Sequence, residues 1–138
     1  REFLRSEGLL GRCVLLRAGH ERMAEFVRPG LAAVMFNLGW LPGGDKRVTT
    51  RTQTTLQALD RALELIAPGG IVTVCVYPGH EEGEREREAL LQAVSELDVR
   101  RFNALHHRFV NATPGAPELY LIQKNPPSQP GEGKKAKT

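Results

Sequence analysis

The sequence predicts an α/β fold in which helices alternate with the strands of a largely parallel sheet. Residues 71–77, Ile-Val-Thr-Val-Cys-Val-Tyr, are apolar on both faces, which is typical of a strand in a sheet covered by helices on both sides. An earlier apolar run, residues 31–36, has the length and composition of a second buried strand. Between the two runs, leucine or isoleucine recurs at helical spacing in residues 56–66. This order is that of a right-handed strand-helix-strand crossover.

The first half of the chain supplies further elements. Residues 1–7 are typical of the end of a helix that Gly8 terminates. Residues 12–17 predict a short buried strand around Cys13, and residues 22–27 predict a short helical turn. Thr50-Arg51-Thr52-Gln53 matches a capping box, which would open the long helix.

The second half continues the alternation. Pro68-Gly69-Gly70 predicts the end of the long helix. Residues 84–97 predict an amphipathic helix, and the acidic run 81–88 before and within it is interpreted as a solvated helix start. Residues 102–109 and 118–123 predict an antiparallel strand pair that closes one edge of the sheet. We expect one domain over residues 1–124 and a disordered basic tail over residues 125–138.

Composition excludes several classes of protein. The 138 residues carry a net charge of +3, and the tail contributes three lysines against one glutamate, so the body is nearly neutral. No apolar run reaches the ~20 residues of a membrane span, and no signal peptide is visible. Cys13 and Cys75 lie in apolar runs, which predicts two buried thiols in a cytoplasmic protein. The scattered histidines and the absence of paired ligand motifs argue against a metal.

Three polar loops follow predicted strands. Gly19, His20 and Glu21 form the first loop, residues 37–46 the second, and residues 77–82 the third. Because parallel strands end at the same edge of a sheet, the loops should meet there and form a ligand site. Asn37 stands where its strand should end and offers both a donor and an acceptor.

The loops carry a resemblance to a known family. Four segments carry it: Asn-Leu-Gly-Trp-Leu-Pro-Gly-Gly-Asp at 37–45, Tyr-Pro-Gly-His-Glu at 77–81, Pro-Gly-Gly at 68–70 and the loop at 19–21. These segments resemble those of class I S-adenosylmethionine-dependent methyltransferases. Within that class they closely resemble the bacterial tRNA methyltransferases that act on 5-aminomethyl-2-thiouridine at the wobble position. The resemblance covers residues 1–124 and implies a Rossmann-like sheet, S-adenosylmethionine as cofactor and tRNA as partner.

The resemblance also implies roles for particular residues. Asn37 would hold the hydrogens of the acceptor amine and aim its lone pair, and His80 would take a proton, with Tyr77 or Asp45 helping to position the amine. His80 could instead be a loop histidine bonded to backbone, and His20 a plain surface histidine. The implied cofactor-binding residues are Gly19, His20, Glu21, Asn37, Leu38 and Gly39. The implied substrate-binding residues are Trp40, Pro42, Gly43, Gly44, Lys46 and Arg47. Trp40 could stack on the base or pack against the sheet rim.

One feature of the family is missing from this sequence. The strand, glycine-rich turn and second strand that open a class I methyltransferase do not occur. In the family those strands lie between the two that correspond to residues 12–17 and 31–36. Without the missing pair, these two cannot be neighbours in the family's manner. We expect a fragment of an enzyme of about 190 residues, from two added units of about 30 residues each. The alternatives are a sheet that closes up differently, or a partner chain, as in a homodimer, that fills the gap. The alternative is a non-catalytic methyltransferase-like domain that binds RNA or a protein.

Overall fold

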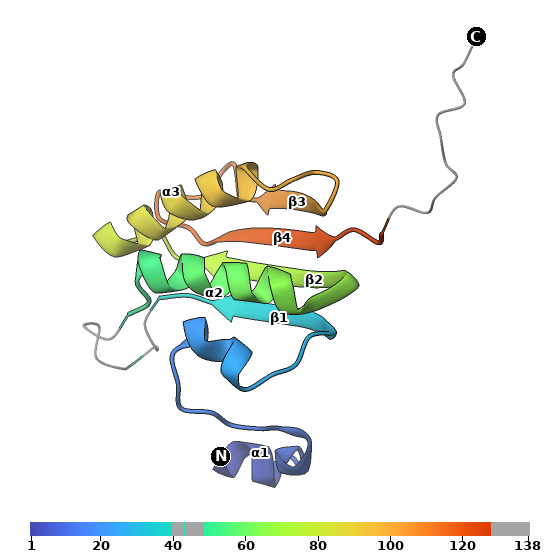
Figure 1. The fold of residues 1–138 in the computed structure, drawn as a ribbon. Coiled ribbons are helices and arrows are strands. Elements are labelled where there is room, and N and C mark those ends of the chain that lie inside the picture. Colours follow the sequence, from blue (N-terminus) through green and yellow to red (C-terminus); the bar gives the residue numbers. More distant parts are fainter. Residues whose placement is uncertain (40–42, 44–48, 128–138) are drawn as a thin grey trace.

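The computed structural model of the chain describes residues 1–39, 43 and 49–127, and shows one four-stranded sheet with helices against it (Figure 1). The strands are β1 (Leu31–Asn37), β2 (Ile66–Val76), β3 (Phe102–His107) and β4 (Glu118–Lys124). The helices are α1 (Glu2–Ser6), α2 (Thr52–Leu65) and α3 (Glu81–Ser95), and two 3₁₀ turns are η1 (Leu10–Arg12) and η2 (His20–Glu25).

The strand order β1-β2-β4-β3 confirms the α/β prediction and the antiparallel pair. β1 and β2 are parallel and are connected by α2, whereas β4 runs antiparallel to both β2 and β3. β1, β2 and β3 therefore point the same way, and their carboxyl ends lie at one edge of the sheet. We call this edge the carboxyl edge.

The core lies between the sheet and the two long helices. Alternate residues of β2 and β4, such as Val74 and Ile122, are buried against Leu59 of α2 and Leu90 of α3. Both helices lie on the same face of the sheet (Figure 1), because successive right-handed crossovers in one direction place their helices on one side.

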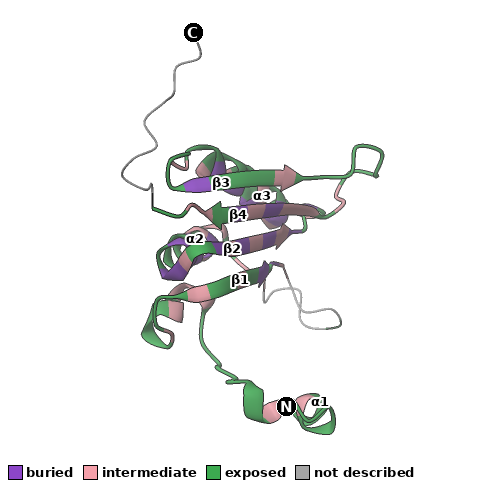
Figure 2. Ribbon diagram, turned by 90° about the vertical axis from the view of Figure 1, so that its right-hand side faces the viewer, coloured by how far each residue is buried: buried purple, intermediate pink, exposed green. Residues whose placement is uncertain are grey.

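The opposite face of the sheet differs from the sequence prediction. Residues 71–77 predicted helical cover on both faces, but Met35 is 81% exposed and Leu105 is 57% exposed. β1 is also only partly buried (Figure 2). Among the described residues, helices cover one face only.

The predicted strand at residues 12–17 is wrong. The segment is extended but lies outside the sheet, and Val14 is 85% exposed. Cys13 is exposed and Cys75 is half-buried, and both are free thiols, so the prediction of two buried cysteines is also wrong. A strand needs a neighbour to pair its backbone groups, and no described strand lies beside this segment.

The ends of α2 also differ from the prediction. No side chain of the predicted capping box caps the helix, which begins at Thr52. At the other end the helix stops at Leu65, and β2 already includes Pro68-Gly69-Gly70. Gly69 has φ +80°, and a Cβ on Gly70 would lie 2.8 Å from the carbonyl oxygen of Ala67, so glycine is required at both positions.

Contacts from the last strand tie it to distant parts of the chain. The Lys124 ammonium donates to the carbonyl oxygens of Leu63 and Ile66 at 2.9 and 3.0 Å, which caps the carboxyl end of α2. Asn125, which the sequence placed in the tail, donates to the carbonyl oxygen of Val99 at 3.0 Å. The folded unit therefore extends at least to this residue.

Candidate functional site

The side chains of Asn37 and Tyr77 meet at the carboxyl edge. Asn37 is the last residue of β1 and pairs in register with Cys75 of β2. Tyr77 follows β2, and its hydroxyl donates a hydrogen bond to Asn37 Oδ1 at 2.9 Å. Two residues that the sequence assigned to one site are thus joined directly, although they come from different loops.

The backbone after Asn37 is held against β2. The N–H of Leu38 donates to the carbonyl oxygen of Cys75 at 3.0 Å, and the Leu38 side chain is buried. Gly39 then turns the chain with φ +99°, a conformation that favours glycine. Asn37 itself remains exposed. Its side-chain amide is therefore held by the hydrogen bond from Tyr77 and is still accessible to a ligand.

A buried carboxylate supports the base of the loop. The N–H of Gly39 donates to Thr50 Oγ1 at 2.9 Å, and the N–H of Thr50 donates to the carbonyl oxygen of Gly39 at 3.2 Å. Thr50 Oγ1 donates in turn to Glu86 Oε2 at 2.9 Å, and Thr55 Oγ1 donates to Glu86 Oε1 at 2.5 Å. Glu86 is 1% exposed. We call Thr50, Thr55 and Glu86 the latch.

A second carboxylate of α3 caps α2. Glu82 Oε1 accepts from the Thr52 N–H at 2.9 Å and from the Thr52 hydroxyl at 3.1 Å. These two hydrogen bonds, first the backbone one, lower the pKa of Glu82 below its ordinary value. The interpretation of residues 81–88 as a solvated helix start is therefore wrong for two of its glutamates, because α2 and α3 pack together through them.

Sequence reasoning missed the latch, although a signal for Glu86 was present. Glu86, Leu90 and Val94 recur every four residues and form the buried stripe of α3. A carboxylate at the head of an apolar stripe needs hydrogen-bond donors. Thr50 and Thr55 supply them, but nothing in the sequence pattern identifies these two threonines.

His80 caps α3. Its Nδ1 accepts a hydrogen bond from the Gly83 N–H at 3.1 Å, and its Nε2 is buried. This geometry matches the alternative that the sequence left open, a loop histidine bonded to backbone. The proposed proton-accepting role of His80 stays a prediction.

Tyr77 is held in its protonated form. The neighbouring Cys75 thiol, to which its side chain is hydrogen-bonded, and partial burial together raise the pKa of Tyr77 above its ordinary value of 10. At neutral pH the hydroxyl is therefore a hydrogen-bond donor, and Asn37 Oδ1 is its acceptor.

The predicted cofactor loop reaches the same end of β1. Gly19 precedes η2, and the ring of His20 contacts the ring of Phe36 edge-on with 5.8 Å between centroids. Phe36 is adjacent to Asn37, so the structure brings the first and second predicted loops together. The Glu21 side chain is half-buried beside them.

Part of the predicted site lies outside the described residues. These predictions concern Trp40, Pro42, Gly44, Asp45, Lys46 and Arg47. Gly43 is described and is exposed, with φ +78°. Among the described residues, no three histidine, cysteine or acidic side chains gather to hold a metal ion. In the same part of the chain, no helix has the length and apolar character of a membrane span.

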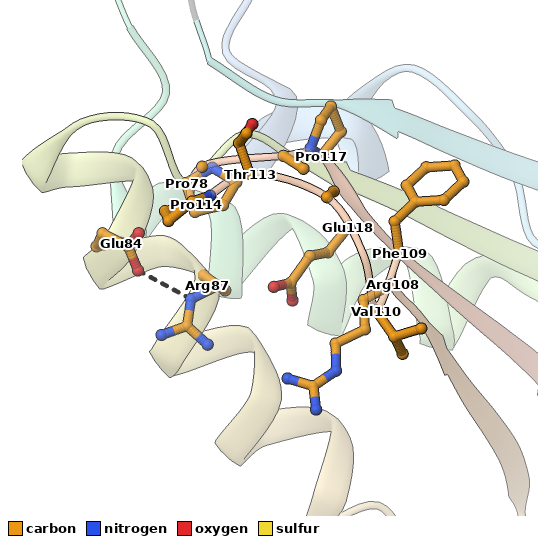
Figure 3. A pocket seen from close by; sticks show the side chains of 13 residues that line it. Pro78, Glu84, Arg87, Arg108, Phe109, Val110, Thr113, Pro114, Pro117 and Glu118 are labelled. Atoms are coloured by element: carbon orange, nitrogen blue, oxygen red, sulfur yellow. Dashed lines mark hydrogen bonds and ion pairs between the residues drawn. The ribbon is translucent and has the colours of Figure 1, made fainter.

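A cavity of about 470 Å³ lies beside the site (Figure 3). Pro78, directly after Tyr77, forms part of its wall, and α3 and the β3–β4 loop form the rest. Two carboxylates line it. Glu84 Oε2 accepts a hydrogen bond from Arg87 Nε at 2.9 Å, and Glu118 Oε2 lies 2.7 Å from His106 Nε2. Sequence reasoning assigned no role to this region.

Comparisons with known proteins identify the family of the chain. Residues 1–123 match the family model described as "Putative rRNA methylase". A "tRNA (mnm(5)s(2)U34)-methyltransferase, chloroplastic" of Arabidopsis thaliana is 37% identical over 115 residues, which are 81% of this chain and 42% of that protein. The chain therefore spans less than half the length of this curated relative.

Solved structures show the same fold. A "putative rRNA-methylase" from Clostridium thermocellum superposes with a TM-score of 0.86 at 38% identity, over 89% of this chain and 66% of that one. A "putative methyltransferase" from Streptococcus mutans, solved in complex with SAH, gives a TM-score of 0.81 at 31% identity over the same shares. The chain belongs to this rRNA methylase family, within the class I methyltransferases.

Proposed function

We propose that the protein transfers a methyl group from S-adenosylmethionine to the amine of 5-aminomethyl-2-thiouridine at the tRNA wobble position. The name of the Arabidopsis relative supports the substrate, and the SAH complex of the Streptococcus mutans protein supports the cofactor. The observation that carries the proposal is the hydrogen bond from Tyr77 to Asn37 Oδ1 at the carboxyl edge.

The residues at this edge fit the cofactor. Gly39 lacks a side chain, and the nearest atom to a Cβ built there is Tyr77 Cδ2 at 3.9 Å, so a ligand can approach the backbone closely. We assign Gly19, His20, Glu21, Leu38 and Gly39 to holding it. When bound, the cofactor supplies an electrophilic methyl group on a sulfonium.

Asn37 is suited to orient an amine. A carbonyl oxygen of an amide has two lone pairs. The Tyr77 hydroxyl uses one lone pair of Asn37 Oδ1 and so fixes the rotamer of the Asn37 side chain. The second lone pair is left to accept a hydrogen of the amine. Holding the amine hydrogens directs the nitrogen lone pair, and orientation of this kind contributes much of the rate of a transfer reaction.

The amine must also lose a proton, because an alkylamine is mostly protonated at neutral pH. His80 would be the general base if its ring turned away from the Gly83 N–H. In the structure that ring caps α3. The proposal therefore has the ammonium release its proton to water before the amine is held, assigns the orienting role to Asn37 and Tyr77, and does not require His80 as base.

The proposal is tested by methyl incorporation from labelled S-adenosylmethionine into anticodon stem-loop RNAs. We expect incorporation when the wobble position carries 5-aminomethyl-2-thiouridine, and none when it carries uridine or 2-thiouridine. Equal incorporation into all three RNAs would contradict the assigned acceptor. If calorimetry shows no S-adenosylmethionine binding at all, the result would instead favour a non-catalytic RNA- or protein-binding domain.

A further inference from the structure

Residues 107–110 leave β3 at the same edge of the sheet as Asn37. The register runs from Asn37 to Cys75, from Cys75 to Leu119, and from Leu119 to His107, so these four residues form one row across the sheet. Neighbouring strands are about 4.8 Å apart, which places His107 about 14 Å from Asn37. A substrate at Asn37 that extends across the edge therefore passes over this segment.

The segment exposes aromatic rings. The rings of His107 and Phe109 are in edge-to-face contact, with centroids 6.1 Å apart and planes at 69°. Phe109 is 65% exposed and Val110 is 93% exposed. Contiguous exposed apolar side chains mark interaction sites, so we interpret these side chains as a contact surface.

Arg108, which stands between His107 and Phe109 in the sequence, adds a positive charge that no described residue neutralises. The carboxylates of the adjacent cavity, Glu84 and Glu118, are already bound to Arg87 and His106. Arg108 itself forms no ion pair within the described part of the chain, and its guanidinium extends into the cavity (Figure 3). Exposed aromatic rings next to an unneutralised cation are the combination that binds single-stranded nucleic acid.

We propose that residues 107–110 bind an unpaired nucleotide that flanks the methylated one. Its base stacks on Phe109, which His107 supports from the side, and a phosphate of the same strand lies at Arg108. The identity of the RNA rests on the proposed function, whereas the contact itself rests on the register, the exposed rings and the unneutralised arginine.

The test measures the Kd of an anticodon stem-loop RNA by fluorescence anisotropy at several salt concentrations. Phe109→Ala should raise Kd about 5- to 150-fold, the range expected for loss of one base–aromatic stack, and Phe109→Trp should retain wild-type binding. Arg108→Ala should reduce the slope of log Kd against log salt by about 0.7, as for one phosphate contact to a single strand.

Two matched controls lie far from this segment. Phe3, on α1, is 71% exposed, and Arg28 is exposed at the opposite edge, ahead of β1. Phe3→Ala and Arg28→Ala should leave both Kd and the salt slope unchanged. S-adenosylmethionine affinity, measured by calorimetry in every variant, shows whether the fold is retained.

The outcomes separate the two proposals. If Phe109→Ala and Arg108→Ala bind the RNA as the wild type does, the flanking-nucleotide contact is overturned and the proposed function is unaffected. If the wild type binds the stem-loop with the expected variant effects but does not methylate it, the contact stands and the proposed function fails. A wild type that does not bind the stem-loop overturns the contact.

Discussion

Thr50 Oγ1 lies 2.9 Å from Glu86 Oε2, so a side chain of α3 that is almost fully buried holds the far end of the loop that begins at Asn37. The same hydroxyl accepts the N–H of Gly39 at 2.9 Å. One threonine therefore connects the backbone beside the proposed amine-orienting residue to the body of the protein. This relationship makes the latch a positioning device for the site.

Loss of the latch hydroxyl should lower both stability and turnover. Thr50→Val keeps the shape of the side chain but leaves the Gly39 N–H and one Glu86 oxygen without their partner, which should cost about 1–3 kcal/mol of unfolding free energy. Turnover should fall as well, because the loop that carries Asn37 loses its anchor. Thr50→Ser retains the hydroxyl and should restore both quantities. Denaturant unfolding and steady-state kinetics measure them, and equal behaviour of the two variants would contradict the role of the hydroxyl.

The cap that Glu82 provides to α2 should depend on pH. Because hydrogen bonds to Thr52 lower the pKa of Glu82 in the folded state, the charged form stabilises the protein above the unfolded pKa, near 4.3. That stabilisation is lost as the pH falls through the folded pKa. Glu82→Gln resembles the protonated form, so it should be less stable than the wild type by about 1 kcal/mol at pH 7 and equally stable at low pH.

The control for this prediction is Glu88→Gln, since the Glu88 side chain is 72% exposed. Its unfolding free energy should follow that of the wild type across the same pH range. A gap between Glu82→Gln and the wild type that did not change with pH would show that the charge of Glu82 is not what stabilises the cap.

Two substitutions separate the capping and proton-accepting roles of His80. Asparagine is a good N-cap residue without a titratable group. If capping is the role of His80, His80→Asn should keep turnover within about twofold, while His80→Ala should lose about 1 kcal/mol of stability. A large loss of turnover in His80→Asn, with unchanged stability and a changed pH–rate profile, would instead establish His80 as the general base.

Tyr77 should affect turnover through Asn37 rather than by contact with the cofactor. Tyr77→Phe removes the donor to Asn37 Oδ1 and should lower kcat by up to about tenfold, the value of one lost hydrogen bond. The affinity for S-adenosylmethionine should not change. An equal effect on cofactor affinity and kcat would contradict a role confined to the rotamer of Asn37.

Much of the sheet could be predicted because its signals are local. The apolar runs that became β1 and β2 and the leucine spacing of α2 each lie within a few residues. The meeting of Asn37 with Tyr77 followed from a topological rule, that parallel strands end at one edge. The resemblance to a family then suggested which polar residues at that edge to consider.

The remaining features depend on contacts that a sequence pattern does not contain. Residues 12–17 have the composition of a strand, but no strand of the described residues lies beside them, so they do not form one. Glu82 and Glu86 look like any solvated helix start until α2 is packed against α3. The Pro-Gly-Gly run predicts a break between helix and strand, but the structure includes it in β2. Only the close approach of the Leu31 and Ala67 backbones to Gly70 shows why the strand has glycine there.

The most direct measurement of the central claim is the rate of methyl transfer by Asn37→Ala, alongside its affinity for S-adenosylmethionine. Asn103→Ala, an exposed asparagine at the start of β3, is the matched control. If Asn37 aims the amine, Asn37→Ala should lose methyl transfer while its cofactor affinity stays within a few-fold of the wild type, and Asn103→Ala should retain both. Unchanged turnover in Asn37→Ala would contradict the account.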